Sequence, residues 1–304
     1  MNLIDVTSEF GTNDKCLAYL EALRWPDGVE CTECGDRRIS KITRHKEGRN
    51  KRGVVYQCLN PKCKAQFSAT SGTLFNDSHL PLVKWFLAVA LMCNAKKGIS
   101  AKQMQRDLHV SYKTAWYLCH RIRKAMEEGE LPKFTGTVEV DETYVGGRYD
   151  RRRKREPWEK QGVMGFVERG GRVEAYPIPT PSTTVLVGKI KDRISTDAEL
   201  VVTDQYIGYK AVDKTHRHAV INHIREWVRG NIHTNTIENF WSLFKRGIIG
   251  SFHKVSAKHL PRYLAEFSYR FNGRGEGNLF AMTLARLAGK IGMPYAELIA
   301  NTEA

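Results

Sequence analysis

The chain has 304 residues and a formal net charge of +15, from 48 lysines and arginines against 33 acidic residues. This positive excess favours a nucleic-acid partner, although a merely basic protein, or one attracted to acidic membranes, has the same charge. The longest apolar run, 85–93, is too short to cross a bilayer, and the N-terminus has no signal-peptide pattern. We therefore expect a cytoplasmic protein without disulfides and with no membrane partner.

The first predicted element is a short amphipathic helix over residues 12–23, with Thr12 as its N-cap. The stretch Trp25-Pro-Asp-Gly ends this helix. We assign residues 1–24 to an N-terminal helical segment.

Two close cysteine pairs follow, Cys31-x2-Cys34 and Cys58-x4-Cys63. Each pair can present two thiolates on one tight turn, and two such turns complete a tetrahedral Zn²⁺ site. Short strand signals surround the pairs, so residues 25–76 are predicted to form a zinc ribbon with one structural Zn²⁺. The alternative is four unpaired cysteines in a small domain. Three further cysteines lie in helical patterns and are expected to be buried thiols: Cys16, Cys93 and Cys119.

Within residues 77–130, the pattern of apolar residues predicts a helix from Leu80 to about Cys93. A helix-turn-helix follows, with helices at 100–108 and 112–126. In such a motif the front of the second helix enters the major groove of DNA. An ordinary helical linker with a charged face is the alternative reading. The shared core is expected to contain Met104, Leu108, Val110, Ala115, Leu118 and Ile122. The candidate DNA contacts are Tyr112, Lys113, Thr114, Tyr117, His120, Arg121, Arg123 and Lys124.

From residue 134 to 274 the pattern changes to strands. Strands are predicted at 137–145, near 162–168 and 172–178, at 199–203 and from 219, with helices at 183–194, from 236 and from 256. This β-β-β-α-β-α order is that of an RNase H-like domain, an α/β fold with a mixed five-stranded sheet. Ser256 is expected to cap the last of these helices. Residues 275–304 are assigned to a helical C-terminal tail.

Three acidic residues in this region suggest a metal site. Asp141 lies in the first strand, Asp204 directly follows the strand at 199–203, and Glu238 lies near the start of a helix. Two strand carboxylates and one helix carboxylate suit a pair of Mg²⁺ ions that act on a phosphodiester. Taken alone, each of these acids would be an ordinary surface residue. Strand alternation puts Glu139 on the face of Asp141, where it could assist, and Glu142 on the other face.

Basic residues adjoin the predicted site. Lys245 lies on the same side of its helix as Glu238 and can contact a phosphate, and Arg246 is a further candidate DNA contact. A basic burst after the first strand either grips DNA near the site or forms a solvated loop. Its candidate contacts are Arg148, Arg151, Arg152, Arg153 and Lys154.

Long motifs give a more specific resemblance. They are 24–28 (RWPDG), 67–75 (FSATSGTLF), 140–147 (VDETYVGG), 203–206 (TDQY), 235–247 (NTIENFWSLFKRG) and 263–272 (YLAEFSYRFN). In this order they resemble the zinc-ribbon DDE transposases of bacterial insertion sequences, of the ISXO-two-like type. The resemblance implies a catalytic triad of Asp141, Asp204 and Glu238, with Lys245 contacting a base or phosphate. It also implies that the zinc ribbon and helix-turn-helix bind the terminal inverted repeats of the element.

The sequence therefore predicts a nucleoid-associated transposase that cuts double-stranded DNA at the ends of its element. Two Mg²⁺ ions, or Mn²⁺, would serve each active site, and the freed 3′-hydroxyl would attack target DNA. Joining two ends suggests a homodimer or a higher assembly on DNA. Two alternatives stay open. One is a DNA-binding regulator with an inactive nuclease-like domain, and the other is an RNase H-like nuclease without strand transfer.

Overall fold

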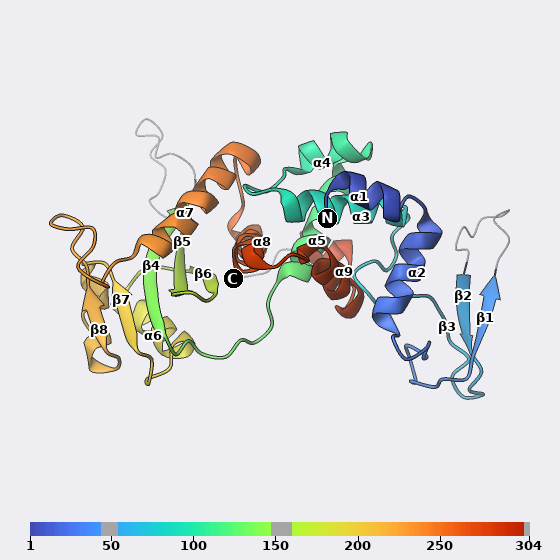
Figure 1. Cartoon of the computed structure of the whole chain (residues 1–304), viewed down its shortest axis with the longest axis horizontal. Coiled ribbons are helices and arrows are strands. Elements are labelled where there is room, and N and C mark those ends of the chain that lie inside the picture. The colour runs from blue at the N-terminus through green and yellow to red at the C-terminus, as the bar shows by residue number, and fades with distance from the viewer. Residues whose placement is uncertain (44–53, 147–159, 301–304) are drawn as a thin grey trace. The chain divides into compact units, whose positions relative to one another are not determined.

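The computed structural model describes residues 1–43, 54–146 and 160–300. The chain divides into two compact units (Figure 1). The first contains residues 1–95, 101–126 and the chain from Gly277 onward, and the second contains residues 96–100 and 127–276. No helix in the described ranges is long and apolar enough to cross a membrane.

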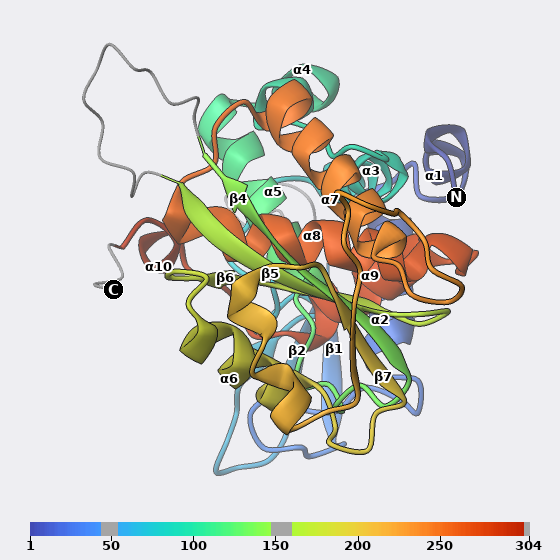
Figure 2. The same cartoon turned by 90° about the vertical axis from the view of Figure 1, so that its left-hand side faces the viewer.

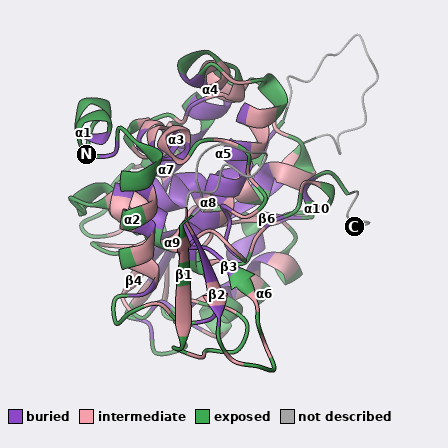
Figure 3. Cartoon of the chain, turned by 90° about the vertical axis from the view of Figure 1, so that its right-hand side faces the viewer, coloured by how far each residue is buried: buried purple, intermediate pink, exposed green. Residues whose placement is uncertain are grey.

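The first unit begins with two short helices, α1 (Leu3–Glu9) and α2 (Asn13–Arg24). The predicted cap of α2 is confirmed, since the Thr12 hydroxyl accepts a hydrogen bond from the Lys15 amide at 3.3 Å. Helix α1 is not predicted by the pattern, because it buries only Val6 and exposes most of its other side chains (Figure 3). Asn2 and Asp5 stabilise it through a capping box.

The predicted ribbon contains a small antiparallel sheet, in the order β1 (Ile39–Thr43), β2 (Val54–Cys58) and β3 (Gln66–Phe67). The rings of Trp25, Tyr56 and Phe67 pack against one another with centroids 5.7 to 5.8 Å apart. The Arg24 guanidinium donates to the carbonyls of Ala69 and Ser71 at 3.0 and 2.7 Å. Arg24 and Trp25 of the 24–28 motif thus secure the ribbon to the chain that follows it.

Helix α3 (Leu82–Asn94) is followed by α4 (Ala101–Leu108) and α5 (Tyr112–Met126), close to the predicted ranges. The turn between α4 and α5 places His109 in the left-handed region with φ of 49°. Ser111 then caps α5 by accepting from the Thr114 amide at 3.1 Å. Five of the six predicted core residues are buried, and Val110 is half-buried.

The C-terminal helices α9 (Leu279–Gly289) and α10 (Tyr295–Ile299) belong to this first unit. Phe280 on α9 packs against Phe10 and Phe86, with ring centroids about 6 Å apart. The Leu74 amide donates to the Leu287 carbonyl at 3.1 Å. The C-terminal tail therefore completes a core that the N-terminal helices begin.

The second unit is built on a mixed five-stranded sheet, which confirms the predicted α/β class. Its strands are β4 (Thr137–Val145), β5 (Gln161–Glu168), β6 (Val173–Ile178), β7 (Leu200–Thr203) and β8 (His218–Val220). Their order in the sheet is β6-β5-β4-β7-β8. The first three strands are antiparallel neighbours, whereas β7 and β8 run parallel to β4.

Helices cover both faces of this sheet (Figures 1 and 2). Alternate residues of β4 and β5, such as Val140 and Phe166, pack under α6 (Thr183–Arg193). The opposite face, with Val163 and Val167, packs under α7 (Asn235–Gly247) and α8 (Leu260–Asn272). Gly165 on this face leaves room for α7, because a Cβ there would lie 2.5 Å from the Trp241 ring.

Short 3-10 turns and one π-helical turn link these elements. They are η2 (Ile207–Tyr209), η3 (Val212–Lys214), the π-helical η4 (Ile248–Phe252), η5 (Ala257–His259) and η6 (Gly273–Gly275). The prediction that the Ser256 side chain caps the last helix of the domain is wrong. Its side chain makes no capping bond, and η5 leads into α8 instead.

Candidate active site and zinc site

The four predicted zinc ligands converge. The Sγ atoms of Cys31 and Cys63 lie 3.7 Å apart, as do those of Cys34 and Cys58, and all four lie within 4.8 Å of one another. A Zn²⁺ tetrahedron with Zn–S bonds of about 2.3 Å has S···S edges of about 3.8 Å. The cysteine cluster therefore fits one tetrahedral zinc ion.

The first two predicted catalytic acids lie on neighbouring parallel strands. The register pairs Glu139 of β4 with Val202 of β7, and the same offset places Asp141 level with Asp204 just past the end of β7. Adjacent strands are about 4.8 Å apart. Asp204 is oriented by the Tyr206 amide, which donates to its Oδ1 at 2.9 Å.

Glu238 reaches the same face from the first turn of α7, which packs on β4 and β5. Burial first, and then the charges of Glu142, Asp204 and Glu238, together raise the pKa of Asp141 to about 7. The charges of the three predicted acids thus act on one another, and a bound divalent cation would offset their repulsion. Among the described residues, these carboxylates do not converge as closely as the cysteines do.

The prediction that Glu139 assists the metal is not supported. Its carboxylate is fully buried and accepts hydrogen bonds from the Thr236 and Ile237 amides at 2.8 and 3.1 Å. Arg169 also donates to it at 3.0 Å. Glu139 therefore caps the N-terminus of α7, where its negative charge suits the helix dipole, and it fixes the turn that carries Glu238.

Glu142 faces away from α7, as strand alternation predicts. The hydroxyl of Tyr209, a residue of the core under α6, donates a hydrogen bond to its carboxylate. Burial raises the pKa of Glu142, and burial together with the charge of Glu142 raises the pKa of Tyr209 well above its usual value. This pair is a second acidic centre beside Asp141, and the sequence pattern does not reveal the role of Tyr209.

Glu238 has two partners that the sequence analysis missed. The Thr234 hydroxyl donates to its Oε1 at 2.7 Å, and the His223 Nε2 lies 3.2 Å from the same oxygen. Thr234 stands at the N-cap of α7, so the capping pattern could have indicated it. Nothing in the local sequence points to His223.

The predicted DNA contacts of α5 separate into exposed and buried groups. Tyr112 and Lys113 are exposed and Thr114 is half-buried. By contrast, Tyr117 and Arg121 both donate to the Met293 carbonyl, and Arg121 is only 4% exposed. The structure therefore does not support Tyr117 and Arg121 as DNA contacts.

The other predicted DNA contacts also divide into buried and exposed residues. His120 and Arg123 are buried, so they too are unsupported as phosphate contacts. Lys245 and Arg246 are exposed on α7. The predicted basic contacts Arg148, Arg151, Arg152, Arg153 and Lys154 lie outside the described residues.

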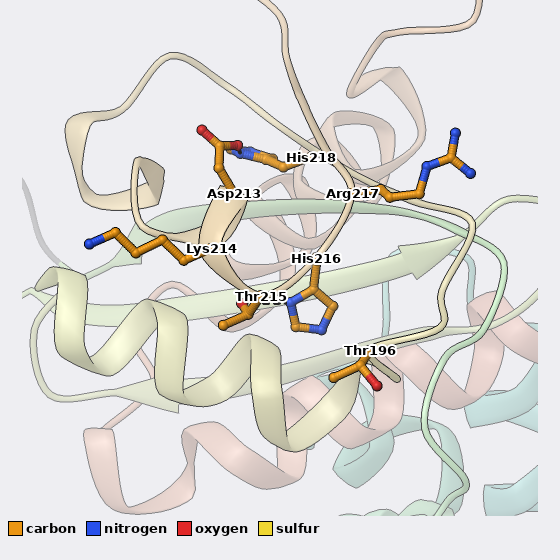
Figure 4. A pocket seen from close by; sticks show the side chains of 7 residues that line it. All are labelled: Thr196, Asp213, Lys214, Thr215, His216, Arg217 and His218. Carbon is orange, nitrogen blue, oxygen red and sulfur yellow. Dashed lines mark hydrogen bonds and ion pairs between the residues drawn. The ribbon is translucent and has the colours of Figure 1, made fainter.

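An open pocket lies toward the opposite end of β7 and β8 from Asp204. It is lined by Thr196 and by residues 213–218 (Figure 4). His218 there joins Asp213 at 2.6 Å and Thr203 at 2.8 Å, and the Thr203 hydroxyl lies 2.9 Å from the Asp204 carbonyl. The pocket does not contain the three acids, but its histidine supports the strand end that carries Asp204.

Comparisons with known proteins identify two domains in the chain. An ISXO2-like transposase domain matches residues 133–272, and a transposase zinc-ribbon domain matches residues 11–66. The first match contains all three acids and the second contains all four zinc ligands. Residues 133–272 therefore match an ISXO2-like transposase domain and residues 11–66 a transposase zinc ribbon, which confirms the resemblance that the sequence motifs predicted.

A protein of Halobacterium salinarum, described as an uncharacterized protein in transposable element ISH50, is 29% identical over 281 residues. The alignment covers 86% of this chain and 91% of that protein. The similarity therefore extends beyond the two matched domains to nearly the whole chain.

Proposed function

We propose that this protein is a DDE transposase that cleaves DNA at the ends of its element and transfers the 3′-hydroxyl ends into target DNA. Asp141, Asp204 and Glu238 are its catalytic carboxylates, and its five-stranded unit is an RNase H-like domain. The observation that carries this proposal is the alignment of Asp141 and Asp204 on neighbouring parallel strands, with Glu238 in the first turn of a helix on the face of Asp141.

These carboxylates would hold Mg²⁺ or Mn²⁺, which prefer oxygen ligands. A pair of such ions supplies a nucleophilic water at neutral pH and stabilises the attacking and leaving oxygens of a phosphodiester. The raised pKa of Asp141 supports a cation site, because burial and three neighbouring negative charges disfavour its ionised form when no cation is bound. Lys245 and Arg246 extend the site along α7 and neutralise DNA phosphates.

Recognition of the terminal inverted repeats is assigned to the first unit. The zinc ribbon and the α4–α5 pair provide the DNA-binding elements, with α5 presenting Tyr112, Lys113 and Thr114 at its front end. The net charge of +15 supports a double-stranded DNA partner. Acting on two ends in one event favours at least a homodimer on DNA, and a DNA partner favours association with the nucleoid.

Two other functions share part of this evidence. A regulator would bind the repeats without cutting them, and an RNase H-like nuclease would cut without joining. The acidic field at Asp141, Asp204 and Glu238 favours an enzyme over the regulator. The match to a transposase domain favours strand transfer over simple hydrolysis.

The decisive experiment incubates the full chain with labelled DNA that carries the inverted repeats flanking its gene, with supercoiled target DNA and Mg²⁺. We expect joined products with the wild type and none with Asp204→Asn, while both bind the repeats equally. Asp197→Asn, an exposed aspartate of the same unit, is the matched control and should join normally. Binding without cleavage in Mg²⁺ or Mn²⁺ would indicate the regulator, and cleavage without joining would indicate the nuclease.

A further inference from the structure

We propose that His223 is a positioning residue for Glu238, a role that rests on the proposed function. With Thr234 it holds one oxygen of the Glu238 carboxylate and leaves the other oxygen for a divalent cation. Both contacts reach Oε1, at 2.7 Å from Thr234 and 3.2 Å from His223. Within the described residues, Oε2 of Glu238 accepts no hydrogen bond.

The hydrogen-bond directions follow from a count of hydrogens. Thr234 has one hydroxyl hydrogen, and it points to Glu238 Oε1, which can only accept. The His223 Nε2 lies 3.0 Å from the Thr234 oxygen, so it must carry the hydrogen of that contact. His223 therefore donates from Nε2 to Thr234, Thr234 donates to Glu238, and the same Nε2 lies 3.2 Å from Glu238 Oε1, so the three side chains form one cluster.

The surroundings of His223 hold its ring in this orientation. The indole of Trp227 packs on it, with ring centroids 5.1 Å apart and an angle of 46° between the planes. The other ring nitrogen, Nδ1, is buried and makes no hydrogen bond within the described residues. The contacts of Nε2 are therefore the polar contacts that orient this side chain. Their partner Thr234 is buried, with 1% of its surface exposed.

His223 belongs to the segment between β8 and α7, whereas Thr234 and Glu238 belong to the start of α7. Glu139 fixes the backbone of that helix end through the Thr236 and Ile237 amides. The side chain is half exposed, at 37%, and would otherwise sample several rotamers. Partners that orient a ligating carboxylate are typically worth about 10- to 100-fold in metal affinity.

The test measures Mn²⁺ binding to the zinc-loaded full chain without DNA, by electron paramagnetic resonance of free Mn²⁺. We expect His223→Asn to weaken Mn²⁺ binding about 10-fold, because the shorter amide does not reach Glu238. His223→Gln, whose amide nitrogen replaces Nε2, should bind within about 3-fold of the wild type. His253→Asn, at an exposed histidine of the same unit, is the matched control and should bind like the wild type. Thermal unfolding of each variant separates lost folding from lost affinity.

The outcomes distinguish this inference from the proposed function. If Glu238→Gln weakens Mn²⁺ binding and His223→Asn does not, the positioning role is wrong and the active site stands. If both His223→Asn and His223→Gln lose affinity equally, the imidazole itself is required, which also contradicts the positioning role. If Mn²⁺ binds equally to the wild type, Asp204→Asn and Glu238→Gln, the proposed metal site fails and the role of His223 fails with it.

Discussion

At the scale of single residues, the fold holds the acids of the candidate site close together in spite of their charge repulsion. Asp141 is half-buried, and the negative charges of Glu142, Asp204 and Glu238 act on it. Glu139 lies on the same strand, but its negative charge is stabilised. Arg169 and two amides of α7 donate hydrogen bonds to its carboxylate. Two neighbouring acids on one face of β4 thus serve different purposes, one electrostatic and one structural.

The raised pKa of Asp141 makes stability depend on pH. Its pKa rises from 3.8 to about 7 on folding, so the folded state favours the proton. This contribution to stability is complete below the unfolded pKa and is lost as pH rises through about 7. Asp141→Asn should therefore raise the free energy of unfolding in Mg²⁺-free buffer at pH 8 by up to about 4 kcal/mol. Urea unfolding of the wild type and Asp141→Asn at pH 8 and pH 5 checks this prediction. An equal change in the free energy of unfolding at both pH values would contradict it.

Removing the charge of Glu139 should lower the free energy of unfolding, whereas removing that of Asp141 should raise it. Glu139→Gln leaves Arg169 and the start of α7 without a carboxylate partner, and we expect it to lower the free energy of unfolding by about 2 kcal/mol. Glu199→Gln changes an exposed glutamate of the same unit and should have almost no effect. Urea unfolding of both variants at pH 7 provides the comparison. Equal stability of the two would show that the buried charge is not needed to hold α7.

At the scale of elements, the ribbon and α7 depend on different stabilising forces. The strands β1 to β3 form a sheet of only three short strands, and their core is the aromatic group around Trp25 together with four cysteines. A sheet of this size needs a metal to hold it. Helix α7 instead buries a continuous apolar stripe that includes Phe240 and Phe244 against the larger sheet.

Loss of zinc should therefore unfold the ribbon locally. Cys31→Ser removes one ligand, and we expect zinc loss and at least a 10-fold drop in amide hydrogen-exchange protection along β2. Protection along β4 should stay the same, because that strand lies in the other unit. Cys93→Ser, outside the cluster, is the matched control and should keep its zinc. Unchanged protection of β2 after confirmed zinc loss would contradict a structural role of the metal.

At the scale of the whole molecule, the two compact units are not two consecutive stretches of sequence. The chain leaves the first unit after Met126, builds the sheet unit, and returns with α9 and α10. Helix α9 buries Phe280, Leu284 and Leu287 against α2, α3 and α5. The first unit is therefore incomplete until the last helices have been added.

Deletion of the chain after Glu276 tests this dependence. We expect the truncated protein to lose the cooperative unfolding transition of the first unit, because three large apolar side chains leave its core. The transition of the sheet unit should remain within about 5 °C of its original temperature. A chain that ends at Ala300 keeps α9 and α10 and is the control. Calorimetry of the three proteins would contradict this view if the deletion left both transitions intact.

Sequence alone was sufficient for features that depend on local pattern. Strand β4 was predicted with its observed bounds, because its residues alternate clearly and many are β-branched. The fold class followed from the order of predicted elements, and the four zinc ligands followed from the spacing of the cysteines. The family match confirmed what the motifs indicated. The three acids could be selected from the sequence because each lies at a predicted strand or helix start, which is a local pattern. Their catalytic role stays a prediction.

The tertiary structure decided which side chains meet. Glu139 and Asp141 look equivalent in the strand pattern, and only the packing of α7 reveals that one caps a helix. Arg121 looks like a phosphate contact on its helix, yet the C-terminal tail covers it. His223 carries no sequence signal, because its contact with Glu238 depends on how the segment after β8 folds back. Periodicity reports which face a residue occupies, whereas the element that covers that face comes from distant parts of the chain.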